Sequence, residues 1–325
     1  MKRWNLSRLC LHLGVGLLAW AAVASICMCI GSTGVHWPIG DETIFRREAV
    51  LLASLVGAAL AAAGTAYQAV LRNPLADPYL LGASSGAALA AYVWRLPEMT
   101  GIASDIGQQA FAFAGALAAV STVLILTTAR SGRRRLDPVT LLLVGVIVNA
   151  VCGALYLLLN AIHKDIPGAG GEMGFLVGGI GHVTSGQFTC AAIATLIGWI
   201  ALMLMSGSLT VATLGEGEAE SLGVRIHRLR WVALCAASLM TAAAVAVSGP
   251  IAFVGLVCPH AVRPLVGGDQ RRLLPAATAA GAILLALADA VSRGLAAQNL
   301  IGTQLQVGIL TGLLGGPFFL TMLLI

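Results

Sequence analysis

Charged side chains are scarce in this sequence. Only 10% of the 325 residues are Asp, Glu, Lys or Arg, 58% are hydrophobic, and the mean hydropathy is +0.90, whereas a soluble domain carries about a quarter charged residues. A water-soluble core cannot absorb that much apolar surface, so we expect residues 1–325 to form a single transmembrane domain. The net charge of +5 does not indicate nucleic acid as a partner, because the basic residues stand singly or in short clusters between apolar runs.

The sequence also lacks the patterns on which nucleotide sites, metal sites and enzymes depend. It has no G-x-x-x-x-G-K-[ST] phosphate loop, so the chain does not bind ATP by that route. The seven cysteines lie in or beside apolar segments without metal-ligand pairing or disulfide spacing, which favours core packing. No nucleophile and base pair up in the loops. We therefore expect no catalytic residue, no bound metal and no cofactor in this chain.

Two kinds of ionisable residue invite a functional interpretation. His260 follows a proline and suggests a metal or haem ligand, but a lone histidine is more often a structural hydrogen-bonding residue. Acidic residues are scarce in the centres of the apolar runs, where a proton-coupled carrier would place them. Asp289 lies near the outer end of its run and can pair with Arg293 at i, i+4.

Apolar runs of about 20 residues, the length that crosses a bilayer core of about 30 Å, recur along the chain. We predict spans near residues 9–30, 49–71, 108–129, 139–162, 188–206, 230–248, 273–292 and 306–324, with shorter apolar helices at 79–94 and 251–264. The sequence thus predicts an all-α membrane protein with ten transmembrane helices. The first run is longer than the apolar region of a cleaved signal peptide, about 7–15 residues, so we interpret it as a span.

Basic residues predict the orientation of these spans. If the N-terminus is cytoplasmic and each span reverses the side, most of the 19 basic residues fall in cytoplasmic loops, as the positive-inside rule requires. This distribution favours an even number of spans, with both termini in the cytoplasm.

Three loops on the predicted cytoplasmic side are too patterned to be simple connectors. Residues 68–78 contain two prolines that end one helix and delay the next, and we interpret this loop as a hinge or gate. Residues 214–224 carry three glutamates between glycines; they suit a basic partner protein, and the alternative is a solvated acidic turn. Residues 249–263 form the third loop, around His260.

Four motifs occur in order from about residue 45 to the C-terminus. They are R-N-P-L-A-D-P followed by L-L-G-A-S-S-G-A, then L-G-E-x-E-A-x-S-L-G-V, F-V-G-L-V-x-P-H-x-V-R and V-G-I-L-T-G-L-L-G-G-P-F-F. In these motifs the chain resembles the FecCD/BtuC-like permease subunits of type II ABC importers, which take up iron siderophores, haem or cobalamin. The resemblance implies the type II ABC importer permease fold and a homodimer with the pathway at its axis. It also implies two cytoplasmic ATPase subunits and a periplasmic substrate-binding protein as partners.

The resemblance further implies roles for particular residues. In the family, the acidic loop, here within about 207–229, forms short coupling helices that sit in a cleft of the ATPase. The matching residues are Leu214, Gly215, Glu216, Glu218, Ala219, Glu220, Leu222 and Gly223, and the candidates for a cytoplasmic gate are Asn73, Leu75, Asp137, Pro138 and Val139.

Binding-protein docking is the third implied role. Arg46 and Arg293 match the family's docking arginines. The chain departs from the family before the second span, where F-R-R-E-A places alanine at one arginine position, and Arg47 is the candidate to compensate. A second departure, Leu305-Gln306 in place of L-P before the last span, also falls on the periplasmic side.

From the resemblance we predict the permease subunit of an ATP-driven importer in the bacterial inner membrane. It would move an iron chelate, a ferric siderophore or haem, from periplasm to cytoplasm, with ATP and magnesium bound only by the partner ATPase chains. A cobalamin importer of the same family is the first alternative, and a carrier or channel acting alone is the second. The sequence does not reveal the cargo, and we favour an iron chelate because it is the family's commonest one.

Overall fold

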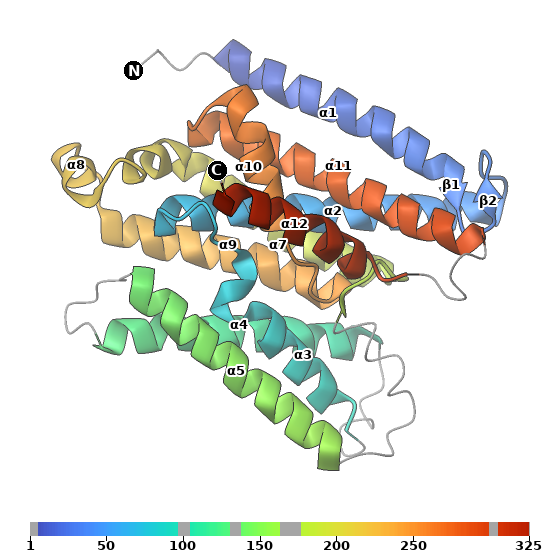
Figure 1. Cartoon of the computed structure of the whole chain (residues 1–325), viewed down its shortest axis with the longest axis horizontal. Coiled ribbons are helices and arrows are strands. Elements are labelled where there is room, and N and C mark those ends of the chain that lie inside the picture. The colour runs from blue at the N-terminus through green and yellow to red at the C-terminus, as the bar shows by residue number, and fades with distance from the viewer. Residues whose placement is uncertain (1–5, 97–104, 131–137, 163–176, 299–304, 325) are drawn as a thin grey trace.

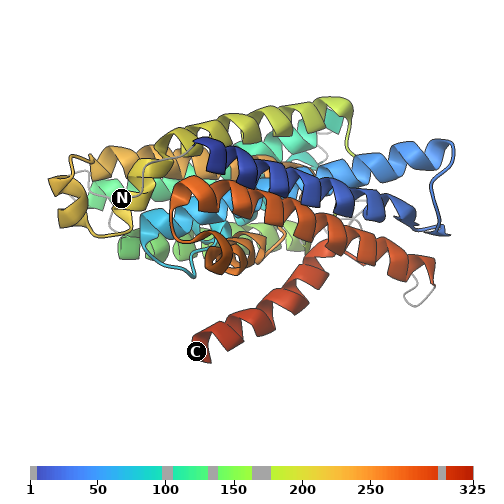
Figure 2. The ribbon, with the colours of Figure 1, turned by 90° about the horizontal axis from the view of Figure 1, so that it is seen from above.

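The computed structural model describes residues 6–96, 105–130, 138–162, 177–298 and 305–324. Its helices are α1 (Leu6–Cys29), α2 (Asp41–Leu71), α3 (Ala83–Trp94), α4 (Asp105–Arg130), α5 (Pro138–Ile162), α7 (Ser185–Ala212), α8 (Glu216–Ser221), α9 (Ile226–Ser248), α10 (Val254–Val266), α11 (Gln270–Ala297) and α12 (Val307–Leu324). A 3-10 turn, η1 (Pro78–Leu81), precedes α3, and strands β1 (Ile30–Gly31) and β2 (Gly34–Val35) form an antiparallel ribbon between α1 and α2. Figure 1 shows an elongated bundle, and Figure 2 shows its C-terminal helix leaving the bundle at an angle.

The helices confirm the all-α membrane fold. Six of the described helices, α2, α4, α5, α7, α9 and α11, are long and apolar enough to cross a membrane. Shorter apolar helices lie within α1, α10 and α12, and α3 has 12 residues. Each predicted apolar run therefore contains a helix, while the number of ten crossings stays a prediction.

At two predicted boundaries the difference from the structure has a local cause. The second span was expected from residue 49, but α2 begins at Asp41 because the segment before it turns at Gly40, and acidic residues in a first helical turn are favourable. The short run at 79–94 is divided into η1 and α3, since Gly82 adopts a left-handed conformation between them. Turn chemistry, which hydropathy does not register, sets both boundaries.

Helix α2 lies at the centre of the bundle and is buried along most of its length from Val50 to Leu71. A Cβ atom at Gly57 would overlap the carbonyl oxygen of Gly281 in α11, and one at Gly64 would overlap that of Gly255 in α10. Small residues permit this backbone-to-backbone approach, which is how helices associate in lipid, where no hydrophobic effect draws them together.

Helix α10 continues through Pro259, and α2 compensates for the hydrogen bond that this proline cannot make. Proline has no N–H to donate, so the carbonyl of Gly255, four residues earlier, loses its helical partner. The Gln68 amide nitrogen donates to the carbonyls of Gly255 and Leu256, at 3.4 Å each, and Arg263 in turn donates to the Gln68 side-chain oxygen at 3.1 Å. The third patterned loop thus contains a proline-bearing helix whose missing backbone hydrogen bond is replaced by a side chain of α2.

The contact between α2 and α10 can be tested by replacing Gly64 with alanine. The added methyl group would overlap the Gly255 carbonyl, and overpacking of this kind costs about 1–3 kcal/mol. We expect a lower thermal unfolding midpoint in detergent and a lower yield of monodisperse protein. Gly153→Ala in α5 is the matched control, because its Cβ meets no atom within 4 Å; equal behaviour of the two variants would contradict the close approach.

Candidate functional site

The acidic loop contains a short helix, α8, between α7 and α9 at one end of the bundle (Figure 1). Gly215 before it and Gly223 after it have positive φ angles of 152° and 80°, which L side chains rarely adopt. Ala219 is fully buried, whereas Leu214 and Leu222 are 65% and 60% exposed. The loop therefore packs against the bundle through Ala219 and leaves Leu214 and Leu222 on the surface. Because α7 extends to Ala212 and α9 starts at Ile226, this segment is shorter than the predicted 207–229.

Glu216 ties α8 to two other helices. Its Oε1 atom accepts from the Arg230 guanidinium in α9 at 2.6 Å and from Arg72, the residue that caps α2, at 3.2 Å. The Arg230 side chain is only 6% exposed, so its charge depends on this partner. We call these three residues the clasp. Glu218 and Glu220 are exposed and have no ion pair within the part of the chain that the structure describes.

The clasp is charged at neutral pH. The hydrogen bond from Arg230, with the charges of Arg230 and Arg72, lowers the pKa of the Glu216 carboxyl below its ordinary value and outweighs its partial burial. A carboxyl with a lowered pKa in the folded state binds fewer protons there than in the unfolded state. Its stabilising contribution is therefore complete above the ordinary carboxyl pKa and is lost only as the pH falls through the lowered pKa.

The predicted gate loop follows the clasp directly. After Arg72, which has a left-handed backbone, the Asn73 side chain accepts from the Leu75 N–H at 2.9 Å and the Asp77 side chain accepts from the Tyr79 N–H at 2.9 Å. Burial raises the pKa of Asp77 to about 6, although N–H groups of Tyr79 and Phe253 lower it. Asn73 and Leu75 are half-buried. The loop is therefore a hydrogen-bonded turn that is partly buried, with Pro74 exposed.

Tyr79 fastens this loop to two further elements. Its hydroxyl accepts from the Ile251 N–H at 2.9 Å, and its carbonyl accepts from the Asn149 amide of α5 at 3.1 Å. Pro138 and Val139 begin α5, with Val139 73% exposed. Asp137 lies outside the described residues. The structure thus ties η1, which follows the first predicted gate segment, to the middle of α5, the helix that begins at the second one. The sequence did not single out Asn149, and gating stays a prediction.

The predicted docking arginines lie around the ribbon, where α1 ends and α2 begins. Arg46 is buried and donates to the carbonyls of Met28 and His36 and to the Thr33 hydroxyl, at 3.1, 2.9 and 2.8 Å. Nothing in the local sequence signals these contacts, because they cross a turn. Arg46 therefore holds the ribbon in this structure.

Arg293 holds the same ribbon from α11. It donates to the carbonyl of Ile30 at 2.7 Å and to Asp289 at 2.9 Å, which confirms the expected i, i+4 pair. Arg47, in contrast, is exposed. Docking by Arg46, Arg47 and Arg293 stays a prediction, and of the three only Arg47 presents its side chain outward.

His260 packs its ring edge-to-face on Phe318 of α12, with centroids 5.9 Å apart. Among the residues that the structure describes, no group of three or more His, Cys, Asp or Glu side chains is placed to hold a metal ion. This environment gives His260 a packing contact between two helices.

Comparisons with known proteins agree on one family. Residues 12–325 match the model of the FecCD transport family. The hemin transport system permease HmuU of Yersinia pestis is 40% identical over 284 residues, 86% of this chain and 81% of that protein. The cobalamin import permease BtuC of Halobacterium salinarum is also 40% identical, over 281 residues, 86% and 72% of the two chains. The Fe(3+) dicitrate permease FecD of Escherichia coli is 34% identical over 325 residues, 97% and 93%.

A solved structure supports the same assignment. A metal-chelate type ABC transporter in an inward-facing conformation superposes with a TM-score of 0.83 at 27% identity, covering 97% of this chain and 99% of that chain. The similarity therefore extends over nearly the whole chain.

The clasp can be tested by Glu216→Gln, which keeps the shape of the side chain and removes its charge. The buried Arg230 would then lose the carboxylate charge at 2.6 Å from its guanidinium group. We expect amide hydrogen exchange, measured by mass spectrometry on the full chain, to rise about tenfold in residues 216–221 and 72–77. Glu220→Gln, which removes an exposed carboxylate of the same helix, is the control. Similar exchange in both variants would show that the clasp does not hold α8.

Proposed function

This chain belongs to the FecCD transport family and is a multi-pass membrane permease of the type II ABC importers, and from that premise we propose that it imports an iron chelate, a ferric siderophore or haem, across the bacterial inner membrane. Relatives and the solved neighbour named for hemin, Fe(3+) dicitrate and a metal chelate support this cargo. The equally similar cobalamin permease makes cobalamin the alternative. The family match argues against a carrier that works alone.

The observation that carries this proposal is the position of α8. It is an exposed acidic helix, with two outward leucines, that is tied by Glu216 to the residue at which the gate loop begins. A partner ATPase that grips α8 and moves on ATP binding would pull on Arg72 and hence on Asn73 and Leu75. In this mechanism the chain converts a movement of its partner into opening of the pathway and carries out no chemistry itself.

The assembly that this mechanism requires contains two copies of the chain, two cytoplasmic ATPase subunits and a periplasmic binding protein. We assign ATP and magnesium to the ATPase chains and place both termini of this chain in the cytoplasm. On this arrangement the clasp faces the ATPases and the ribbon faces the binding protein, because α2 runs between the two ends of the bundle (Figure 1).

Reconstitution tests function and cargo together. Liposomes that contain this chain with its ATPase, supplied with the binding protein, are expected to accumulate haem or a ferric siderophore only when ATP is present. Uptake of the two iron chelates and of cyanocobalamin should be measured side by side. Exclusive uptake of cobalamin would replace the cargo proposed here, and uptake by the chain without ATP would refute the ABC mechanism.

The role of α8 in ATPase docking can be separated from the clasp. Changing Glu218 and Glu220 to lysine reverses two exposed charges and leaves Glu216 with its partners. We expect at least about tenfold weaker co-purification with the ATPase, since like charges across an interface are costly. The control is Asp41→Lys, because Asp41 is an exposed carboxylate at the start of α2, the end of that helix that lies far from α8. Unchanged association of the double variant would exclude α8 as the acidic docking element.

A further inference from the structure

Helix α9 carries a narrow exposed face that begins with two arginines. Arg225, Arg228, Val232 and Cys235 are all exposed, and their spacing of three or four residues places them on one side of a helix. Between them, Leu229, Ala233 and Leu234 are buried, and His227 and Trp231 are partly buried. A basic pair at the helix start therefore continues directly into an apolar stripe.

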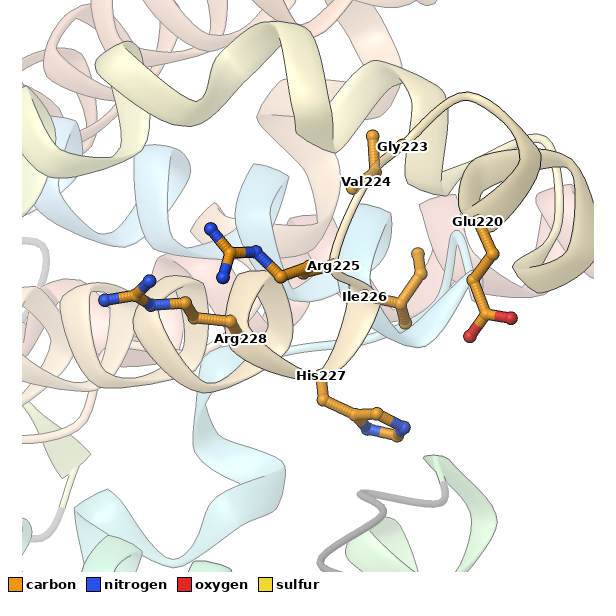
Figure 3. A pocket seen from close by; sticks show the side chains of 7 residues that line it. All are labelled: Glu220, Gly223, Val224, Arg225, Ile226, His227 and Arg228. Atoms are coloured by element: carbon orange, nitrogen blue, oxygen red, sulfur yellow. The ribbon is translucent and has the colours of Figure 1, made fainter.

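Arg225 and Arg228 differ from the neighbouring arginines in having no partner within the described part of the chain. Arg230 and Arg72 both donate to Glu216, whereas no ion pair or hydrogen bond engages the side chains of Arg225 and Arg228 among the residues that the structure describes. They line a pocket of about 510 Å³ where α8 meets α9. Figure 3 shows both guanidinium groups directed the same way along α9, away from Glu220, while His227 points to the other side.

The position of the pair relative to the bilayer indicates the ligand. Helix α9 has 23 residues, or about 34 Å at 1.5 Å per residue, slightly more than a hydrocarbon core of about 30 Å. Its first turn therefore lies at the level of the lipid head groups. Arginine at this level is stabilised by lipid phosphate, which its planar group can bind with two hydrogen bonds.

We propose that Arg225 and Arg228 bind the phosphate of an anionic phospholipid whose acyl chain lies along Val232 and Cys235. The apolar stripe and the direction of the side chains away from α8 favour a lipid over an acidic protein surface. The site is separate from the clasp, since Arg230 and Glu216 are already paired. The site lies within about one helical turn of Arg230. Lipid binding would therefore stabilise the first turns of α9, which carry Arg230.

Lipid titration of the purified full-length chain tests the site. Binding of phosphatidylglycerol and of phosphatidylcholine with the same acyl chains should be measured by native mass spectrometry, in detergent, for wild type, Arg228→Gln and the Arg225→Gln/Arg228→Gln double variant. We expect preference for phosphatidylglycerol in the wild type, and roughly fivefold weaker binding in the single variant and thirtyfold weaker in the double variant. The control is Arg47→Gln, because Arg47 is exposed and lies near the start of α2, at the opposite end of the bundle from α8. This variant should change binding by less than about twofold.

Three results would overturn the proposal. The first is an equal loss of phosphatidylglycerol binding in Arg47→Gln and Arg228→Gln, which would mean that the anionic lipid binds to surface charge in general and not to a particular site. The second is displacement of the lipid by inorganic phosphate at millimolar concentration, which would show an anion site that needs no acyl chain. The third is a double variant that binds phosphatidylglycerol like the wild type but loses the ATPase on co-purification, which would assign the arginines to a protein interface.

Discussion

The close approach of α2 to α10 and α11 is the contact on which the rest of this structure depends. Inside a bilayer no hydrophobic effect draws helices together, so packing needs backbones that can touch. Gly57 and Gly64 provide that access. Only at this separation can Gln68 reach the carbonyl that Pro259 leaves without a partner. The same contact that holds the bundle together therefore permits a proline inside one of its helices.

The C-terminal end of α2 connects this packed region to the acidic loop and to the predicted gate loop. A helix fixed along its length ends at Arg72, and the clasp joins that end to α8 and α9. The gate loop is likewise bound to the third loop and to α5 through Tyr79. A displacement of α8 consequently has a short, continuous route to Asn73, through an ion pair and one helix cap. If the ion pair or the helix cap were flexible, the same movement of α8 would not reach Asn73.

Arginine has three different physical roles in this chain. Arg46 and Arg293 are buried and donate to backbone carbonyls at the end of α1 and in and beside the ribbon. Arg72 and Arg230 share one carboxylate. Arg225 and Arg228 are exposed above an apolar stripe. The positive-inside count treats all of these residues alike, although burial and the available partners give them separate functions.

Much of this protein was determined by its sequence alone. Helix positions follow from apolar runs, the short helix in the acidic loop from its glycines and family motif, and the pair of Asp289 with Arg293 from a spacing of four residues, because each depends on neighbours within a turn or two. Helix count, gating and docking were predicted there and stay predictions. Only the tertiary structure decided that Arg72 meets Glu216, 144 positions away, and that Arg293 binds Ile30, 263 positions away. Such contacts depend on how every helix between them packs, and no local rule specifies that.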